Sequence, residues 1–301
     1  MGPLKRIVTD FVGHLDKVGA PMARSDEGFF SAKDDTRLFW RSLMPEKPKA
    51  IVGIVHGYGD HSGRYLHVMQ ALAQQNLGTV ALDYRGHGKA DGRRADVLHW
   101  PDYLGDLELF WSRVRETAAT HGSVPTFLFA HSHGALMATH WAFRRPEGLS
   151  GLLLSAPFYQ LALQAPPLKL FGARLIKNIM PWLHLSNELK VEQLSTDTAW
   201  QKSSSEDPLY LHVLTPRWFF ETQAAQEQLT GRGKDFVAPV TFLAGGADPI
   251  ASMPAARAFF ETVASSDKQW KEYPGFRHEV WAEVGKAGLI TDIVEWISKR
   301  C

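Results

Sequence analysis

Apolar and polar positions alternate with two different periods along most of the chain. Short apolar runs rich in β-branched and aromatic residues predict strands over residues 28–33, 36–43, 50–56, 78–83, 125–131, 151–155, 239–244 and 268–274. Apolar residues at helical spacing predict helices over residues 65–75, 103–120, 135–145, 254–264 and 289–299. Runs such as "IVGIV" and "TFLF" are apolar on both faces, which is typical of parallel strands covered on both sides. The pattern predicts an α/β fold in which helices cover both faces of a mostly parallel sheet.

The strand pattern is interrupted over about seventy residues and then resumes. The interruption begins with the apolar "LALQAPPLKLFGARLIKNIMPWLHL" and continues with the polar "STDTAWQKSSSEDP". We predict that residues 1–156 and 230–301 form one α/β core and that residues 157–229 form a helical cap inserted over it. Doubly wound sheets bind ligands at the carboxyl ends of their strands, so we expect the cap to cover that edge.

Composition and charge narrow the class of protein. Apolar residues make up 45% and charged residues 22% of the 301 positions, as in a soluble globular protein. The net charge of +1, with both signs interspersed, predicts no nucleic-acid partner. The single cysteine, Cys301, excludes an internal disulfide within the chain. We see no signal-peptide pattern and no apolar run of membrane-spanning length, so the expected location is cytoplasmic, with peripheral membrane contact left open.

The stretch "FLFAHSHGALMA" places Ser132 between a predicted strand and a predicted helix. This is the context of a nucleophile elbow, in which G-x-S-x-G holds a serine hydroxyl exposed above the sheet. Gly134 fills the second glycine position, and Ala130 replaces the first with one extra methyl group. A motif this short predicts a nucleophile only if the sequence also offers an acid and a histidine to complete a triad.

Two partners follow in the chain order of a serine hydrolase. Asp248 comes after the strand predicted at 239–244, and His278 comes after the next predicted strand. Because parallel strands end at the same sheet edge, we expect both side chains beside Ser132. In a catalytic triad, the serine attacks an acyl carbon, the histidine acts as base and then as acid, and the aspartate orients the imidazole. Asp248 could instead cap a helix, because Pro249 follows it.

The negative oxygen of a tetrahedral intermediate needs two N–H donors. We assign one to the backbone N–H of His133, the residue after the nucleophile. The other is assigned to the N–H of Tyr58, in the loop after the strand predicted at 50–56.

Five sequence blocks occur in an informative order: "HGYGDHSGRY", "DYRGHGKADG", "AHSHG", "GGADPI" and "GFRHEVWAE". Together they resemble the monoacylglycerol lipase and lysophospholipase-like branch of the α/β-hydrolase superfamily, over about residues 28–297. The resemblance implies an α/β-hydrolase fold, with the oxyanion hole in the first block, the serine in the third, and the acid and histidine in the last two. The family's elbow usually reads G-H-S-M-G-G, so Ala130, His133 and Ala135 are departures. Ala90 replaces a usual serine.

The histidines on either side of the serine allow a different interpretation. His131 and His133, together with His56 or His140, could be ligands of a zinc ion. The chain has neither an H-E-x-x-H nor an H-x-H-x-D-H pattern, so we predict no metal and no cofactor. We interpret His131 as structural, and His56 and His87 as residues that hold loop backbones.

The leading hypothesis is a serine carboxylester hydrolase that cleaves a monoacylglycerol, a lysophospholipid or a similar single-chain ester through an acyl-enzyme. The same triad would also serve a generic small-ester esterase, a thioesterase, a carbon–carbon hydrolase or a peptidase. A catalytically dead hydrolase fold used for binding is a further alternative. The apolar part of residues 157–229 predicts core packing, an acyl-binding wall, or contact with a membrane or micelle. The pattern does not specify an oligomeric state.

Overall fold

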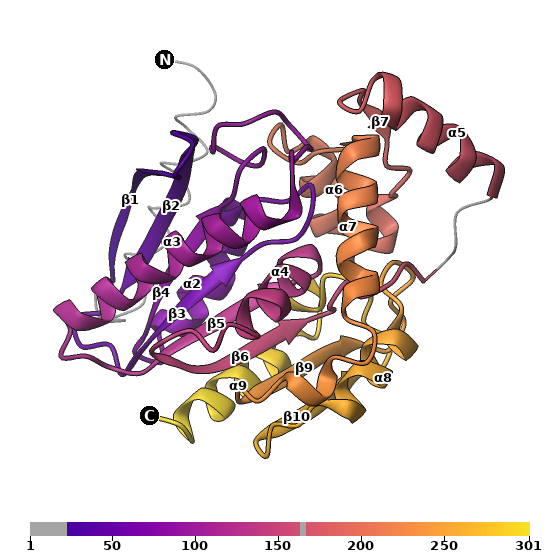
Figure 1. The fold of residues 1–301 in the computed structure, drawn as a ribbon. Helices are drawn as coiled ribbons and strands as arrows, with labels where there is room; N and C mark the ends of the chain where they lie inside the picture. Colours follow the sequence, from indigo (N-terminus) through magenta and orange to yellow (C-terminus); the bar gives the residue numbers. More distant parts are fainter. Residues whose placement is uncertain (1–22, 163–166) are drawn as a thin grey trace.

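The computed structural model describes residues 23–162 and 167–301, which form an α/β structure around one large sheet (Figure 1). The eight strands are, in spatial order, β1 (Arg24–Ser31), β2 (Arg37–Met44), β4 (Leu77–Asp83), β3 (Ala50–Val55), β5 (Thr126–His131), β6 (Leu149–Ser155), β9 (Val240–Gly245) and β10 (Lys268–Tyr273). The pairs β1–β2 and β2–β4 are antiparallel, and all the other pairs are parallel. The predicted mostly parallel sheet is therefore confirmed.

The predicted strands agree with the observed ones, with one difference at the first strand. β1 begins at Arg24, four residues before the predicted start. Its opening "RSDE" is exposed, and β1 is an edge strand that pairs only with β2. An exposed edge strand needs no apolar residues, so the apolar pattern reveals only its second half.

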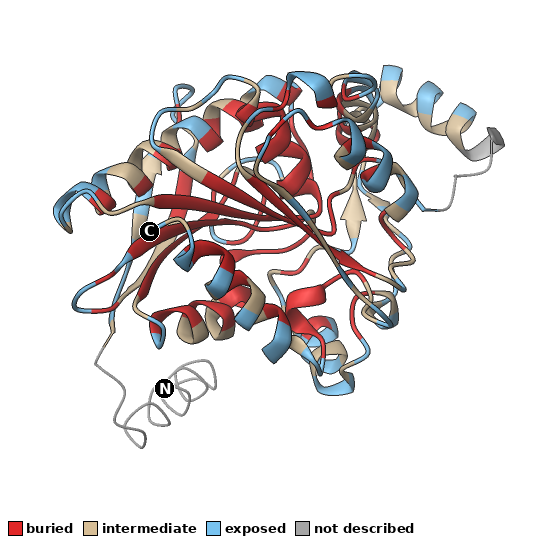
Figure 2. Cartoon of the chain, turned by 90° about the horizontal axis from the view of Figure 1, so that it is seen from below, coloured by how far each residue is buried: buried red, intermediate tan, exposed pale blue. Residues whose placement is uncertain are grey.

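Helices cover both faces of the sheet, and Figure 2 shows the buried strands between the helical layers. The five predicted helices are present as α2 (Leu66–Ala73), α3 (Trp100–Thr120), α4 (His133–Ala142), α8 (Met253–Thr262) and α9 (Lys286–Ser298). Residues of α3, α4 and α8 belong to one hydrophobic cluster, and those of α2 and α9 belong to another. Consecutive residues of β5 alternate between the two clusters: Leu128 lies in the first and Phe129 in the second. This alternation explains why β5 is buried at every position and apolar from Phe127 to Ala130.

The described residues of 157–229 contribute no strand to the large sheet. They form α5 (Pro167–Ile179), η3 (Val191–Gln193), α6 (Thr198–Glu206) and α7 (Pro216–Gln228). One feature was not predicted: β7 (Leu185–Ser186) and β8 (Val213–Leu214) pair as a separate two-stranded antiparallel sheet. In Figure 1, α5 lies outermost and packs on α7.

Three further 3-10 helices connect these elements: η2 (Ser62–Tyr65), η4 (Gly233–Asp235) and η5 (Val280–Ala282). Over the described ranges, no helix has both the length and the apolar character that a membrane crossing requires.

Candidate active site

Ser132 occupies a sharp turn between β5 and α4. Its backbone has φ 52° and ψ −116°, a conformation that costs energy for any residue with a side chain. The turn also brings α4 very close to the loop after β3: a Cβ on Gly134 would lie 2.4 Å from the carbonyl oxygen of His56. Only glycine fits that position without a shift. Ala130, by contrast, is a strand residue of β5, where the additional methyl group is simply buried.

The structure brings Ser132 together with both predicted partners. The Nε2 atom of His278 lies 2.8 Å from the Oγ atom of Ser132, and its Nδ1 atom lies 2.8 Å from Oδ2 of Asp248. The other carboxylate oxygen, Oδ1, accepts hydrogen bonds from the backbone N–H groups of Ile250 and Ala251 at 2.8 and 3.0 Å. Those bonds fix the orientation of the carboxylate, which in turn orients the imidazole.

The structure excludes the alternative interpretation of Asp248 as a helix cap, and it buries His278. Asp248 does not cap a helix, because α8 begins at Met253 and its N-cap is Ser252. His278 is not a surface residue, because only 5% of it is exposed.

The electrostatic environment makes His278 a stronger base. Burial disfavours the charged imidazolium, but the charge and the hydrogen bond of the adjacent Asp248 carboxylate oppose burial, and the pKa of His278 is raised above its usual value. Glu279 and Asp60 act in the same direction from further away. The arrangement can therefore remove a proton from the Ser132 hydroxyl and stabilise the charge that results.

The two predicted oxyanion donors come from separate segments next to Ser132. His133 is the first residue of α4, where the backbone N–H groups of a helix have no partner within the helix. Tyr58 follows Gly57, and a Cβ on Gly57 would lie 3.3 Å from the Cβ of Ser132, so this loop passes directly against the serine. Within the described residues, no backbone acceptor bonds to either N–H group.

The His133 side chain is fully buried among aromatic rings. Its Nε2 atom accepts a hydrogen bond from the indole N–H of Trp218 at 3.2 Å, and its Nδ1 atom lies 3.4 Å from the hydroxyl of Tyr84. Burial lowers the pKa of His133 to about 3, so its imidazole is neutral. Ring centroids within 6.0 Å belong to Tyr58, Tyr84, Trp100, Tyr103 and Trp218. Both ring nitrogens of His133 thus face other partners, Trp218 and Tyr84, and not the Ser132 hydroxyl.

The other histidines near the serine have separate partners. The Nδ1 atom of His131 lies 3.1 Å from the hydroxyl of Ser155. His56, His87 and His140 each donate a ring N–H to a backbone carbonyl, at 2.7, 3.1 and 2.9 Å. Among the described residues, no three histidine, cysteine, aspartate or glutamate side chains are grouped as a metal site.

A cavity of about 860 Å³ opens at Ser132 and His278. Much of its wall comes from residues 157–229, including the apolar side chains of Leu170, Ile176 and Phe219. The described residues of the wall include no lysine and no arginine. The cavity therefore offers a largely apolar surface beside the serine, with carboxylates but no cation among its described wall residues.

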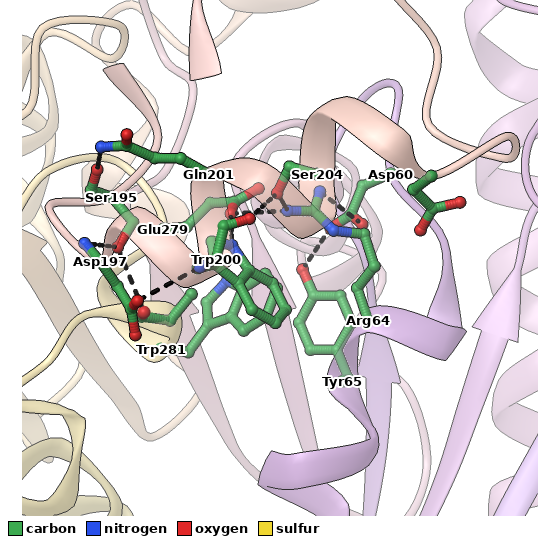
Figure 3. A network of polar contacts seen from close by, with 12 residues as sticks. Asp60, Arg64, Tyr65, Ser195, Asp197, Trp200, Gln201, Ser204, Glu279 and Trp281 are labelled. Atoms are coloured by element: carbon green, nitrogen blue, oxygen red, sulfur yellow. Dashed lines mark hydrogen bonds and ion pairs between the residues drawn. The ribbon is translucent and has the colours of Figure 1, made fainter. Parts of the chain in front are cut away.

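A buried ion network next to the site was not predicted (Figure 3). The guanidinium of Arg64 bonds to Oε2 of Glu279 at 2.9 Å, to Oδ1 of Asp60 at 3.2 Å and to the Ser204 hydroxyl at 2.7 Å. Glu279 also accepts the indole N–H of Trp200 at 2.6 Å. The network connects the His278 loop, the loop after β3 and helix α6. Asp60 and Arg64 stand in "HGYGDHSGRY", between strand β3 and helix α2, and nothing in this segment indicates that Arg64 pairs with Glu279.

The strand order and the elbow at the end of β5 define an α/β-hydrolase. Residues 46–285 match the Hydrolase_4 family model, described as "Serine aminopeptidase, S33". Because this match covers most of the chain, the chain belongs to that family.

Known relatives specify the branch of the family. The chain is 28% identical over 273 residues to a monoacylglycerol lipase of Mycolicibacterium smegmatis. This alignment covers 90% of this chain and 96% of that protein. It is 30% identical over 273 residues to an uncharacterized abhydrolase domain-containing protein of Dictyostelium discoideum; this alignment covers 89% of the chain but only 28% of that longer protein. The crystal structure of Paleococcus ferrophilus monoacylglycerol lipase superposes with a TM-score of 0.73 at 26% identity and covers 92% of this chain and 100% of that one. The chain is thus a hydrolase of the monoacylglycerol lipase-like branch.

Proposed function

We propose that this protein is a serine carboxylester hydrolase that cleaves single-acyl-chain lipid esters, such as monoacylglycerols or lysophospholipids. The observation that carries the proposal is the hydrogen-bonded sequence from Ser132 through His278 to Asp248, at the base of an apolar cavity. Residues 157–229 act as the cap through which the substrate reaches the serine.

The reaction proceeds through an acyl-enzyme. The Oγ atom of Ser132 attacks the ester carbonyl carbon while His278 takes its proton, and Asp248 stabilises the imidazolium. The N–H groups of Tyr58 and His133 bind the oxyanion. When the tetrahedral intermediate collapses, the imidazolium gives its proton to the departing alcohol. Water then attacks the acyl-enzyme by the same route and releases the fatty acid.

The cavity supports an acyl chain with a small, uncharged head group. Each buried methylene contributes about 0.8 kcal/mol to binding, so an apolar wall favours longer chains. The described wall has no cation to bind a phosphate, which favours a glycerol ester over a lysophospholipid. The names of the two lipase relatives point to the same substrate class.

The family description suggests cleavage of an amide bond as a second candidate. An aminopeptidase needs a free carboxylate to bind the substrate ammonium group. Asp60, Glu188 and Glu279 line the cavity, and the Arg64 guanidinium engages the two carboxylates nearest the serine loop, Asp60 and Glu279. This pairing favours the ester.

We also propose that helix α5 and the turn after it contact the lipid surface from which the substrate comes. Its large apolar side chains are exposed, with 61% of Phe171, 51% of Leu175 and 74% of Ile179 accessible, and Met180 and Trp182 extend the surface. An amphipathic helix with such a face binds at the membrane–water interface.

Labelling with a fluorophosphonate, followed by a substrate panel, tests the proposal. We expect the wild type and the control Ser25→Ala to be labelled and Ser132→Ala to remain unlabelled. Monoacylglycerols should be hydrolysed faster than lysophosphatidylcholine, acyl thioesters and aminoacyl amides. A wild-type protein that is not labelled would instead support a binding protein, and faster cleavage of amides would support a peptidase.

A further inference from the structure

The geometry points to Trp218 as a positioning residue of the oxyanion hole, which it connects to helix α7. This inference rests on the proposed function, in which the backbone N–H groups of Tyr58 and His133 are the oxyanion donors. The Trp218 indole contacts both residues. Its ring stacks on Tyr58 with centroids 3.5 Å apart at 26°, and its N–H donates to Nε2 of His133 at 3.2 Å.

The hydrogen bond from Trp218 determines which tautomer His133 adopts, and the Thr222 hydroxyl lies 3.4 Å from the same Nε2 atom, where it can only donate as well. An indole N–H can only donate, so the Nε2 atom of His133 carries no proton. The neutral ring then has its proton on Nδ1, which faces the Tyr84 hydroxyl at 3.4 Å. That hydroxyl donates in turn to the carbonyl oxygen of Gly57 at 2.8 Å. One directed series of hydrogen bonds therefore runs from α7 to the loop after β3.

The Gly57 carbonyl matters because it belongs to the same peptide unit as the Tyr58 N–H. In a trans peptide the C=O and N–H groups point in opposite directions. Donors from Tyr84 at 2.8 Å and His56 at 2.7 Å hold the carbonyl on one side, and this aims the N–H to the other. The series thus fixes the direction of one oxyanion donor and packs the side chain of the other.

Helix α7 is held firmly enough to transmit this constraint. Its N-cap Thr215 accepts the backbone N–H of Trp218 at 3.2 Å and donates to the buried carboxylate of Asp96 at 2.8 Å. Arg217 forms an ion pair with the same carboxylate. The Tyr58 hydroxyl lies 3.0 Å from the carbonyl of Ala95, next to Asp96 in the chain. Trp218 is therefore fixed from its own helix as well as from the rings it touches.

Trp218→Phe tests the inference because it keeps the stacked ring and removes the N–H donor. Removing a complete oxyanion donor lowers kcat by 10² to 10³. In Trp218→Phe the donor is only misaligned, so we expect a smaller, about tenfold loss of kcat, with KM within about twofold of the wild-type value. Affinity for an alkyl boronic acid, which forms a tetrahedral adduct with the serine, should fall by the same factor as kcat/KM. The matched control is Trp270→Phe on the edge strand β10, which should change none of the three quantities.

His133→Met supplies the second variant and completes a double-mutant cycle. It removes the acceptor but keeps the backbone N–H, so alone it should also lower kcat and boronate affinity. Combining it with Trp218→Phe should cost no more than about twofold beyond either single variant, because both break the same hydrogen bond. Thermal unfolding verifies that each variant is folded. If Trp218→Phe does not fold, His133→Met alone tests the inference.

Unchanged kcat and boronate affinity in a folded single variant, or additive losses in the double variant, would overturn the inference. Such a result leaves the proposed function intact as long as fluorophosphonate labels Ser132 in the wild type. A wild type that is not labelled removes the proposed function itself. The two failures are therefore distinguishable.

Discussion

The Arg64 guanidinium and the Glu279 carboxylate bond at 2.9 Å, and both side chains are at least 96% buried, with 4% and 3% exposed. Glu279 directly follows His278 in the chain, so this ion pair anchors the loop that carries the imidazole. Burial raises the pKa of Glu279, although the charge of Arg64 opposes that effect. Replacing either residue of the pair by an uncharged one would therefore leave the charge of the other buried without a partner.

Replacing Arg64 by methionine should reduce the free energy of unfolding by about 3–5 kcal/mol, because Glu279 and Asp60 lose their buried cation. The charge of Arg64 lowers the Glu279 pKa, so without it this pKa is raised further in the folded variant than in the wild type. The variant therefore gains more stability than the wild type as pH falls, and the deficit should be smaller in acid than in alkaline solution. Urea unfolding of the wild type and the variant, in acid and in alkaline solution, measures this deficit. The control is Arg37→Met in the exposed pair with Asp91, which should show no measurable change. A deficit independent of pH would mean that lost packing, not charge, is the cause.

The second prediction concerns the three residues that carry the proposed chemistry. Ser132→Ala and His278→Ala should each lower kcat for a monoacylglycerol by about 10⁶. Asp248→Asn should cost about 10⁴, because an amide at that position stabilises the wrong imidazole tautomer. Asp235→Asn, at the exposed end of η4, is the control and should retain full activity. Near-normal turnover by Asp248→Asn would assign the orienting role to another acid.

The third prediction concerns pH dependence. The base form of His278 is the unprotonated imidazole, and its pKa is raised above 6.5. We therefore expect kcat/KM to fall as pH decreases through a value above 6.5, in a profile with slope one. Removing the negative charge in Asp248→Asn should move the acid limb of the residual activity to lower pH. If the limb stays in place, a group other than His278 determines it.

The fourth prediction separates the acyl-binding wall from the lipid-facing surface. With soluble esters, kcat/KM should rise with acyl length through medium chains, because each added methylene is buried. Leu170→Asp and Ile176→Asp, in the cavity wall, should flatten that rise and leave acetate esters nearly unaffected. Phe171→Asp is a matched change on the exposed face of α5. It should leave the soluble-ester series unchanged and lower turnover only on vesicles. A flat wild-type series would favour a small-ester esterase.

The local pattern of the sequence was sufficient for the framework. β3 and β5 are short, mainly apolar runs that are buried at every position, and α3 has apolar residues at helical spacing, so neighbouring residues alone were enough to predict these elements. The placement of Asp248 and His278 followed because both come directly after strands, and parallel strands end at one edge. No such rule applied to the exposed start of β1 or to the short strands β7 and β8, whose pairing depends on neighbours distant in the chain.

Tertiary structure alone decided which buried polar groups meet. Arg64 and Glu279 are separated by 215 positions, and Trp218 and His133 by 85. Nothing in either local segment identifies the other, because a hydrogen-bond partner is selected by the path of the folded chain and not by the spacing of nearby residues. Burial then makes such pairing obligatory, since an unpaired charge or N–H away from water is costly. The sequence therefore determined where the candidate triad residues lie relative to the strands, and the fold determined what holds them in place.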